Sequence, residues 1–203
     1  MKKIILLAAL VAGTASVAVA GEKARLGVRA GLNFDSQTVS GGGTSETSDS
    51  KFGFHLGAVV DVPLASCAAA LPEWLYFQPG LYFTTKGGKW DARFIKNTTS
   101  LYYLELPLLV SAKLSLTDNL KVRADFGPSI GFAVGGKTKV GSFSGKVFDN
   151  DKTRRFNFGL DFGLGVEYRQ LYLGAGYDLG LTSMRTDNSL KNRTFSISLG
   201  YNF

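Results

Sequence analysis

Cysteine and histidine are nearly absent from the sequence, which contains one of each, Cys67 and His55. A single cysteine cannot form an intramolecular disulfide, and one cysteine with one histidine cannot supply the ligands of a structural zinc site. We therefore expect no metal and no cofactor. Long apolar runs are also missing, because no stretch of 18 apolar residues occurs beyond residue 20. The sequence thus predicts no transmembrane helix after that point.

The N-terminus carries the one extended apolar segment. Two lysines precede it, and Ala18-Val19-Ala20 then has the small-residue spacing of a signal-peptide cleavage site. A membrane anchor is the alternative, but so short a segment, rich in alanine and glycine, would span a bilayer poorly. The sequence predicts a cleaved Sec signal peptide over residues 1–20 and one domain over 21–203. Cleavage would lower the formal net charge of +7 by two.

Short alternating segments take the place of long apolar runs. The stretch YLELPLLVSAKL, residues 103–114, contains a glutamate and a proline within an apolar run. A helix would not hold Pro107 in its middle, and a fully buried strand would not hold Glu105 without a partner. A strand with one apolar face and one polar face accommodates both. Seven other segments show the same alternation: 25–34, 52–62, 75–85, 120–134, 156–168, 171–181 and 194–203.

The connections between these segments alternate in length. Long polar connections, at 35–51, 86–99, 136–155 and 182–193, follow every second segment, whereas the connections at the other end are mostly short. This rhythm is typical of outer-membrane barrels, with the apolar faces toward lipid. A soluble lipocalin-like barrel is the alternative, but its interior would not hold so many Phe and Leu side chains. The sequence predicts an all-β fold, an eight-stranded antiparallel up-and-down transmembrane β-barrel of the outer-membrane type.

Three prolines interrupt the predicted strands, namely Pro79, Pro107 and Pro128. Each lacks the N–H that a strand donates to its neighbour, and a closed barrel has no free edge for such a residue. We expect bulges or local kinks at these positions.

Several stretches resemble one known family. YLELPLLV resembles the Y-x-E-I-P-L-L motif of the PorT-like family of small outer-membrane β-barrel proteins, and LYFQPGLYFTTKGGK, FGPSIGFAVGGK and RRFNFGLDFGLGVEY are similar to its strands. The ending LGYNF is similar to the signal, here ending at Phe203, by which the barrel-assembly machinery recognises its precursors. The resemblance implies the outer membrane of a Gram-negative bacterium, with both termini periplasmic. It departs at Gly80, where the family usually has a lumenal glutamate.

Charged residues fall on the polar faces of the predicted strands, which would line the barrel lumen. We expect one group of them near the periplasmic end and a second group nearer the middle, paired across the interior because isolated buried charge is costly. A plug of ion pairs is therefore favoured over a small-solute pore, which stays as the alternative. The first group is Arg25, Asp61, Lys113, Arg123 and Glu167, and the second is Arg29, Glu105, Asp125, Asp161 and Asp178.

The predicted outer loops contain far more lysine and arginine than aspartate and glutamate. Lys86 is one of these loop residues, and a basic patch is expected from Lys89, Arg93, Lys96, Lys137, Lys139, Arg154, Arg155, Arg185 and Lys191. Charge complementarity suggests lipopolysaccharide phosphates as the partner. A solvated rim without a ligand is the alternative, and the exported location argues against nucleic acid.

Two motifs suggest enzyme chemistry, and neither is favoured. GFAVGGKT, residues 131–138, matches the phosphate-loop pattern, but its glycines lie in an alternating strand and no helix follows. His55 faces the predicted lumen and could act as a base for a serine, as a lipid hydrolase requires, although a hydrogen-bonded structural histidine is favoured. The sequence predicts a non-enzymatic anchor or scaffold that presents extracellular loops to anionic glycolipid or to a protein partner. A secretion-system component is a further alternative.

Overall fold

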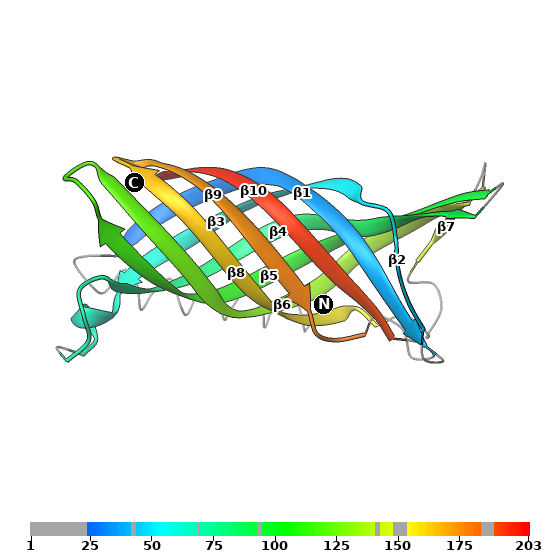
Figure 1. Cartoon of the computed structure of the whole chain (residues 1–203), viewed down its shortest axis with the longest axis horizontal. Coiled ribbons are helices and arrows are strands. Elements are labelled where there is room, and N and C mark those ends of the chain that lie inside the picture. The colour runs from blue at the N-terminus through cyan, green and yellow to red at the C-terminus, as the bar shows by residue number, and fades with distance from the viewer. Residues whose placement is uncertain are drawn as a thin grey trace.

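The computed structural model describes residues 24–41, 44–68, 70–92, 95–140, 143–147, 154–183 and 189–203. Eight long strands run up and down, each paired antiparallel with the next, and β10 pairs with β1 to close a barrel (Figure 1). They are β1 (Arg25–Gly41), β3 (Lys51–Pro63), β4 (Leu75–Ala92), β5 (Ile95–Ser115), β6 (Leu120–Val140), β8 (Phe156–Tyr168), β9 (Leu171–Gly180) and β10 (Ser189–Asn202). The predicted eight-stranded antiparallel barrel is confirmed.

Three short elements complete the described chain. β2 (Thr44–Thr47) pairs with β1, β7 (Phe143–Lys146) pairs with β6, and a single 3-10 turn, η1 (Leu64–Ser66), follows β3. Within the described ranges, no helix is long and apolar enough to cross a membrane. The predicted signal peptide, residues 1–20, lies outside the described residues. We call the end with the β5–β6 and β8–β9 connections the short-turn end, and the opposite end the long-loop end.

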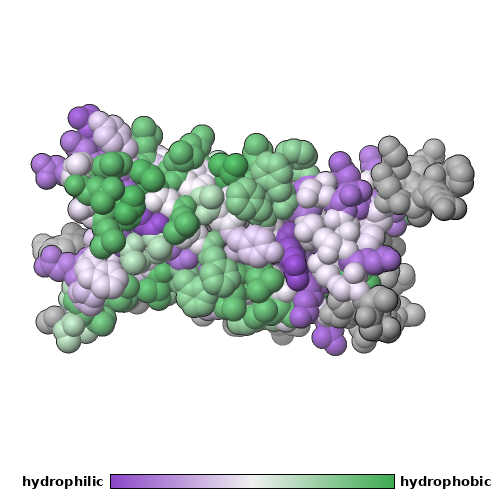
Figure 2. All heavy atoms as spheres, in the orientation of Figure 1, coloured by the Kyte–Doolittle hydropathy of each residue, from purple (hydrophilic) through white to green (hydrophobic). Residues whose placement is uncertain are grey.

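The two faces of the wall have opposite character. Outward side chains are apolar and exposed, with 55% of Leu32, 66% of Phe52 and 68% of Leu164 accessible. Figure 2 shows an apolar band around the middle of the visible face, with hydrophilic residues at both ends. Inward side chains such as Arg29 and Arg123 are polar and buried. This is the reverse of a soluble barrel and the arrangement that a lipid surround requires.

The strands extend further at the long-loop end than the alternation predicted. β5 and β6 have 21 residues each, whereas about 10 tilted residues suffice to span the apolar core. Much of the predicted loops 86–99 and 136–155 is therefore strand. Beyond the membrane both faces can be polar, so the sequence carries no alternation there. Residues 131–138, the phosphate-loop pattern, lie inside continuous strand β6 and form no such loop.

Of the bulges or local kinks expected at the prolines, no bulge is found. The pairs on either side of each proline keep one register, and the ladder has a gap toward one neighbouring strand: β3 for Pro79, β4 for Pro107 and β5 for Pro128. A missing donor thus removes pairing without inserting a residue. The register shift between β5 and β6 lies elsewhere, between Tyr102 and Tyr103, where β6 has Val134 as an extra residue.

Inward-facing glycines let strands and side chains approach closely. A Cβ added at Gly31 would overlap the carbonyl oxygen of Ile197 on β10 and the His55 ring, and a backbone atom cannot move aside cheaply. We predict that Gly31→Ala lowers the free energy of unfolding by about 1–3 kcal/mol. Urea titration of the folded, heat-modifiable band on gels measures this. Gly135→Ala is the matched control, because its Cβ would sit 3.6 Å from Tyr102; equal stability of the two variants would contradict the packing argument.

Candidate functional site

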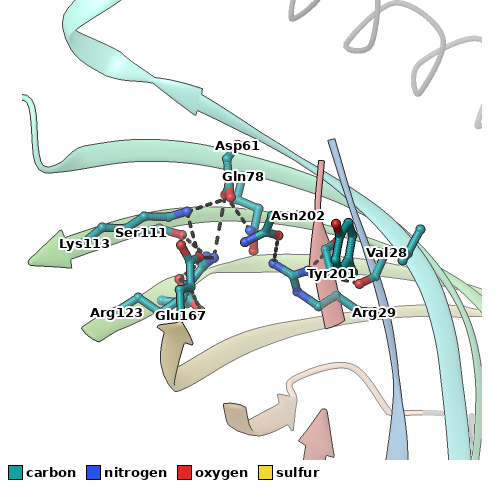
Figure 3. Close-up of polar contacts among 11 residues, drawn as sticks. Val28, Arg29, Asp61, Gln78, Ser111, Lys113, Arg123, Glu167, Tyr201 and Asn202 are labelled. Atoms are coloured by element: carbon teal, nitrogen blue, oxygen red, sulfur yellow. Dashed lines mark hydrogen bonds and ion pairs between the residues drawn. The ribbon is translucent and has the colours of Figure 1, made fainter. Parts of the chain in front are cut away.

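Five charged residues from four strands meet inside the barrel near the short-turn end, and we call them the short-turn cluster: Asp61, Lys113, Arg123, Asp125 and Glu167. The Lys113 ammonium lies 2.6 Å from Asp61 Oδ2 and 2.9 Å from Glu167 Oε1. Gln78 on β4 donates its amide to the other oxygen of Asp61, at 2.6 Å. Figure 3 shows these groups converging across the lumen.

Arg123 is the centre of the short-turn cluster. Its Nη1 lies 2.8 Å from Glu167 Oε1, and its Nη2 lies 2.6 Å from Asp125 Oδ1. Its Nε also donates to both oxygens of Asp125, and its Nη2 donates to Ser111 Oγ at 2.7 Å. The guanidinium is 1% exposed, so these charge-assisted bonds lie away from bulk water. Asp125 therefore belongs to this cluster and not to the middle of the barrel, where the sequence placed it.

Arg29 and Arg25 have other surroundings than predicted. Arg29 was expected to face the carboxylates of the middle group, but its Nη2 donates to Asn202 Oδ1 at 2.6 Å. Its guanidinium carbon also lies 4.1 Å from the centre of the Tyr172 ring, a cation–π contact. Arg25 is exposed at the short-turn mouth, a cavity of about 770 Å³ that Glu73 and Lys121 also line. Among the residues that the structure describes, neither arginine forms an ion pair.

A second group, the mid-lumen cluster, consists of Lys86, Glu105, Asp161 and Asp178. Lys86 Nζ lies 2.5 Å from Glu105 Oε1 and 3.1 Å from Asp178 Oδ1, and the lysine side chain is 1% exposed. Asp161 sits directly opposite Asp178 on the β8–β9 ladder. The three carboxyl groups fall in the predicted middle, but their cation was assigned to a loop. Continuing the alternation of Tyr82 and Thr84 by one step along β4 would have placed Lys86 in the lumen.

Side chains from both clusters line a cavity of about 130 Å³ between them, shared with Arg29, His55 and Ser198. The ion pairs of the two clusters reach across the lumen at two different levels along the barrel. Within the described part of the chain, no three His, Cys, Asp or Glu side chains gather where they could hold a metal ion. The arrangement can bind water and hold charges in place.

His55 is held in a fixed tautomer by its neighbours. The Asn33 amide donates to Thr84 Oγ1 at 2.8 Å and to Thr85 O at 3.1 Å, which leaves its oxygen facing His55 Nδ1 at 2.7 Å. Nδ1 must then donate, so Nε2 accepts from Ser198 Oγ at 2.9 Å. The sequence could not identify which serine lies beside His55.

The Ser198–His55–Asn33 arrangement has the order of a nucleophile, a base and an orienting group. Acyl transfer also requires donors for a developing oxyanion. Among the described cationic and amide donors that line the cavity, the groups of Arg29, Gln78 and Lys86 already bind Asn202, Asp61 and Glu105. The geometry shows His55 as a hydrogen-bonded histidine of the lumen.

The predicted basic patch lies largely on strands. Lys89, Lys137, Lys139 and Lys191 are exposed positions of β4, β6 and β10, and Arg154 and Arg155 are exposed just before β8. Arg93 and Arg185 lie outside the described residues, and Lys96 is placed on β5 without a described side chain. Arg155 also donates to the carbonyl of Ala133, at 3.3 Å. The described members surround the barrel at its long-loop end.

Residues 15–185 match a family model described as an outer membrane protein beta-barrel domain. Neisserial surface protein A is 15% identical, with 90% of this chain and 100% of that chain covered and a TM-score of 0.53. The outer membrane enzyme PagL is 13% identical, with 83% and 98% covered and a TM-score of 0.50. Ail of Yersinia pestis is 14% identical, with 88% and 98% covered and a TM-score of 0.46. Comparison with curated protein sequences finds no match.

Proposed function

The chain belongs to the outer membrane protein beta-barrel domain family, and from this premise we propose that it is a sealed membrane anchor. On this proposal the barrel itself transports nothing, and the strand extensions and loops at the long-loop end interact with anionic glycolipid or with a protein partner. The narrower relation to PorT-like barrels is part of the proposal and is supported by YLELPLL, residues 103–109.

The observation that carries the proposal is the pair of ion-paired layers across the lumen. Lys86 joins β4 to β5 and β9 at one level, and Lys113 and Arg123 join β5 and β6 to β3 and β8 at the other. Eight-stranded barrels are narrow, so side chains that meet across the interior leave little room for a continuous water column. Opening a path would require breaking buried charge pairs, which is strongly unfavourable.

The orientation that we propose places the short-turn end in the periplasm. Short turns on the periplasmic side and long extensions outside are the usual arrangement in this class. Both described termini lie at the short-turn end, where Phe203 N donates to Leu26 O at 2.8 Å. The C-terminal Phe203 is then available to the barrel-assembly machinery before folding, and the basic positions of β4, β6 and β10 face the exterior.

Planar-bilayer recording tests the sealed lumen. We predict that the purified, refolded chain inserts without producing steady conductance steps, whereas an open porin recorded under the same conditions conducts. Heat-modifiable migration on gels shows beforehand that the protein is folded, so that silence reflects a closed barrel. Reproducible single-channel steps from folded protein would overturn the sealed anchor and leave the small-solute pore as the function.

A further inference from the structure

Lysine and hydroxyl side chains lie in rows across the outer face of the β4–β7 extension. Lys89 on β4 pairs with Thr98 on β5, which pairs with Lys139 on β6, which pairs with Ser144 on β7. One row closer to the membrane, Ser100 on β5 pairs with Lys137 on β6, which pairs with Lys146 on β7. The side chains of Lys89, Lys137, Lys139 and Ser144 are exposed, and Thr98 and Ser100 are half-buried. Figure 1 shows these strands projecting beyond the rest of the barrel.

The bulge between β5 and β6 determines where two of these lysines point. Below it, odd-numbered residues of β6 such as Arg123 and Ala133 face inward and are buried. Val134 is the extra residue, so Tyr102 pairs with Gly135 and fully buried Leu101 pairs with Gly136. The inward parity changes from odd to even, and Lys137 and Lys139 turn outward. Without the bulge, both ammonium groups would point into the extension.

The lysine rows begin one step beyond a group of aromatic side chains on the lipid face, Phe54, Phe83 and Tyr102, which we call the aromatic girdle. The Tyr102 ring stacks on Phe83 at 6.2 Å, and Phe83 contacts exposed Phe54 on the lipid face. Ser100 and Lys137 lie one same-face step beyond Tyr102 and Gly135, which is about 7 Å along the strand. The headgroup layer is roughly 5–8 Å thick on each side of the hydrocarbon. The first lysine row therefore lies at headgroup level and the second just outside it.

We propose that Lys89, Lys137 and Lys139, with the hydroxyl groups of Thr98 and Ser100 between them, bind the phosphate groups of an outer-leaflet glycolipid. This inference deepens the proposed function, since it names the chemistry that the exposed extension recognises. Ammonium and hydroxyl groups both donate to phosphate oxygens. The glycolipid is favoured over a soluble anion because the aromatic girdle, on the membrane side of the lysines, also offers a surface for the acyl chains of the same molecule.

Binding of bisphosphorylated lipid A to the refolded chain in neutral detergent tests this site. The triple variant Lys89→Gln, Lys137→Gln, Lys139→Gln is expected to bind at least about tenfold more weakly than wild type. Wild-type binding should also weaken as salt is raised, because the groups are exposed and screened. The matched control, Arg25→Gln, Lys121→Gln, Arg169→Gln, removes the same charge at the short-turn end and should bind like wild type.

Dephosphorylated lipid A is a further probe, which separates recognition of phosphate from recognition of acyl chains. Dephosphorylated lipid A should bind wild type as weakly as bisphosphorylated lipid A binds the triple variant. Equal loss in the two triple variants would show an effect of net charge alone, and undiminished binding of the dephosphorylated lipid would show recognition of acyl chains alone; either result overturns the phosphate site. This assay measures lipid binding and not conductance. Failure of the sealed anchor, which the bilayer recording tests, is therefore distinguishable from failure of the phosphate site.

Discussion

Replacing Lys86 with methionine is expected to lower the free energy of unfolding by about 3–5 kcal/mol, because it leaves two carboxylates buried without their cation. Glu105 and Asp178 both lie within ion-pair distance of Lys86 Nζ, and each carboxylate side chain is 13% exposed. Asp161, directly opposite Asp178, adds a third negative group to the same space. Urea titration of the refolded protein, followed by heat-modifiable migration, measures the loss.

Two comparisons separate the charge from the side chain itself. Lys89→Met changes an exposed lysine of the same strand and is expected to alter stability by less than about 0.5 kcal/mol. Adding Glu105→Gln and Asp178→Asn to Lys86→Met removes the unpaired charges, and replacing a whole buried ion pair by neutral groups is often close to neutral. The triple variant should therefore recover most of the loss. A Lys86→Met barrel as stable as wild type would contradict the buried pairing.

The alternation in the sequence was sufficient to predict the barrel and the direction of most side chains. Side chains of a strand alternate between its two faces, so a strand that faces lipid has an apolar residue at every second position. The other set, which contains Glu105 and Arg123, must then face inward. The spacing of the strands also separated the charges near the short-turn end from Glu105, Asp161 and Asp178 nearer the middle, but it placed Asp125 in the wrong group. Such a pattern defines a face and a level, but it does not define which partners a long side chain reaches.

The failures of the sequence prediction occur where that pattern stops or shifts. Lys86 was assigned to a loop because the apolar face of β4 ends at Phe83, although the inward face continues. Asp125 was grouped with Glu105 by level, whereas the guanidinium two residues away on its own strand binds it. The bulge at Val134 was not predicted, although Gly135 and Gly136 follow it, and it reverses the faces of Lys137 and Lys139. In the strand extension the outward residues are polar as well, so an apolar alternation no longer indicates which way a side chain faces.

Arg123 is the second position where one substitution is expected to have a large effect. Arg123→Met should lower the free energy of unfolding by about 3–5 kcal/mol, since Asp125 then keeps no cation. Lys113 forms ion pairs with Asp61 and Glu167, so those two carboxylates retain a partner. The stability of Arg123→Lys should lie between those of Arg123→Met and wild type, because an ammonium cannot reproduce the fork that binds Asp125 through Nε and Nη2. The same urea titration ranks the three proteins.

A double-mutant cycle then tests whether the loss of stability comes from the unpaired charge of Asp125. Asp125→Asn in the Arg123→Met background removes the stranded charge, and we expect the pair to couple by about 1–3 kcal/mol, so that the double variant is more stable than additivity allows. Arg169→Met, at an exposed turn of the same end, should leave stability unchanged and controls for loss of an arginine. Additive losses at Arg123 and Asp125 would mean that the guanidinium acts through Glu167 and Ser111, and that the direct contact with Asp125 contributes little.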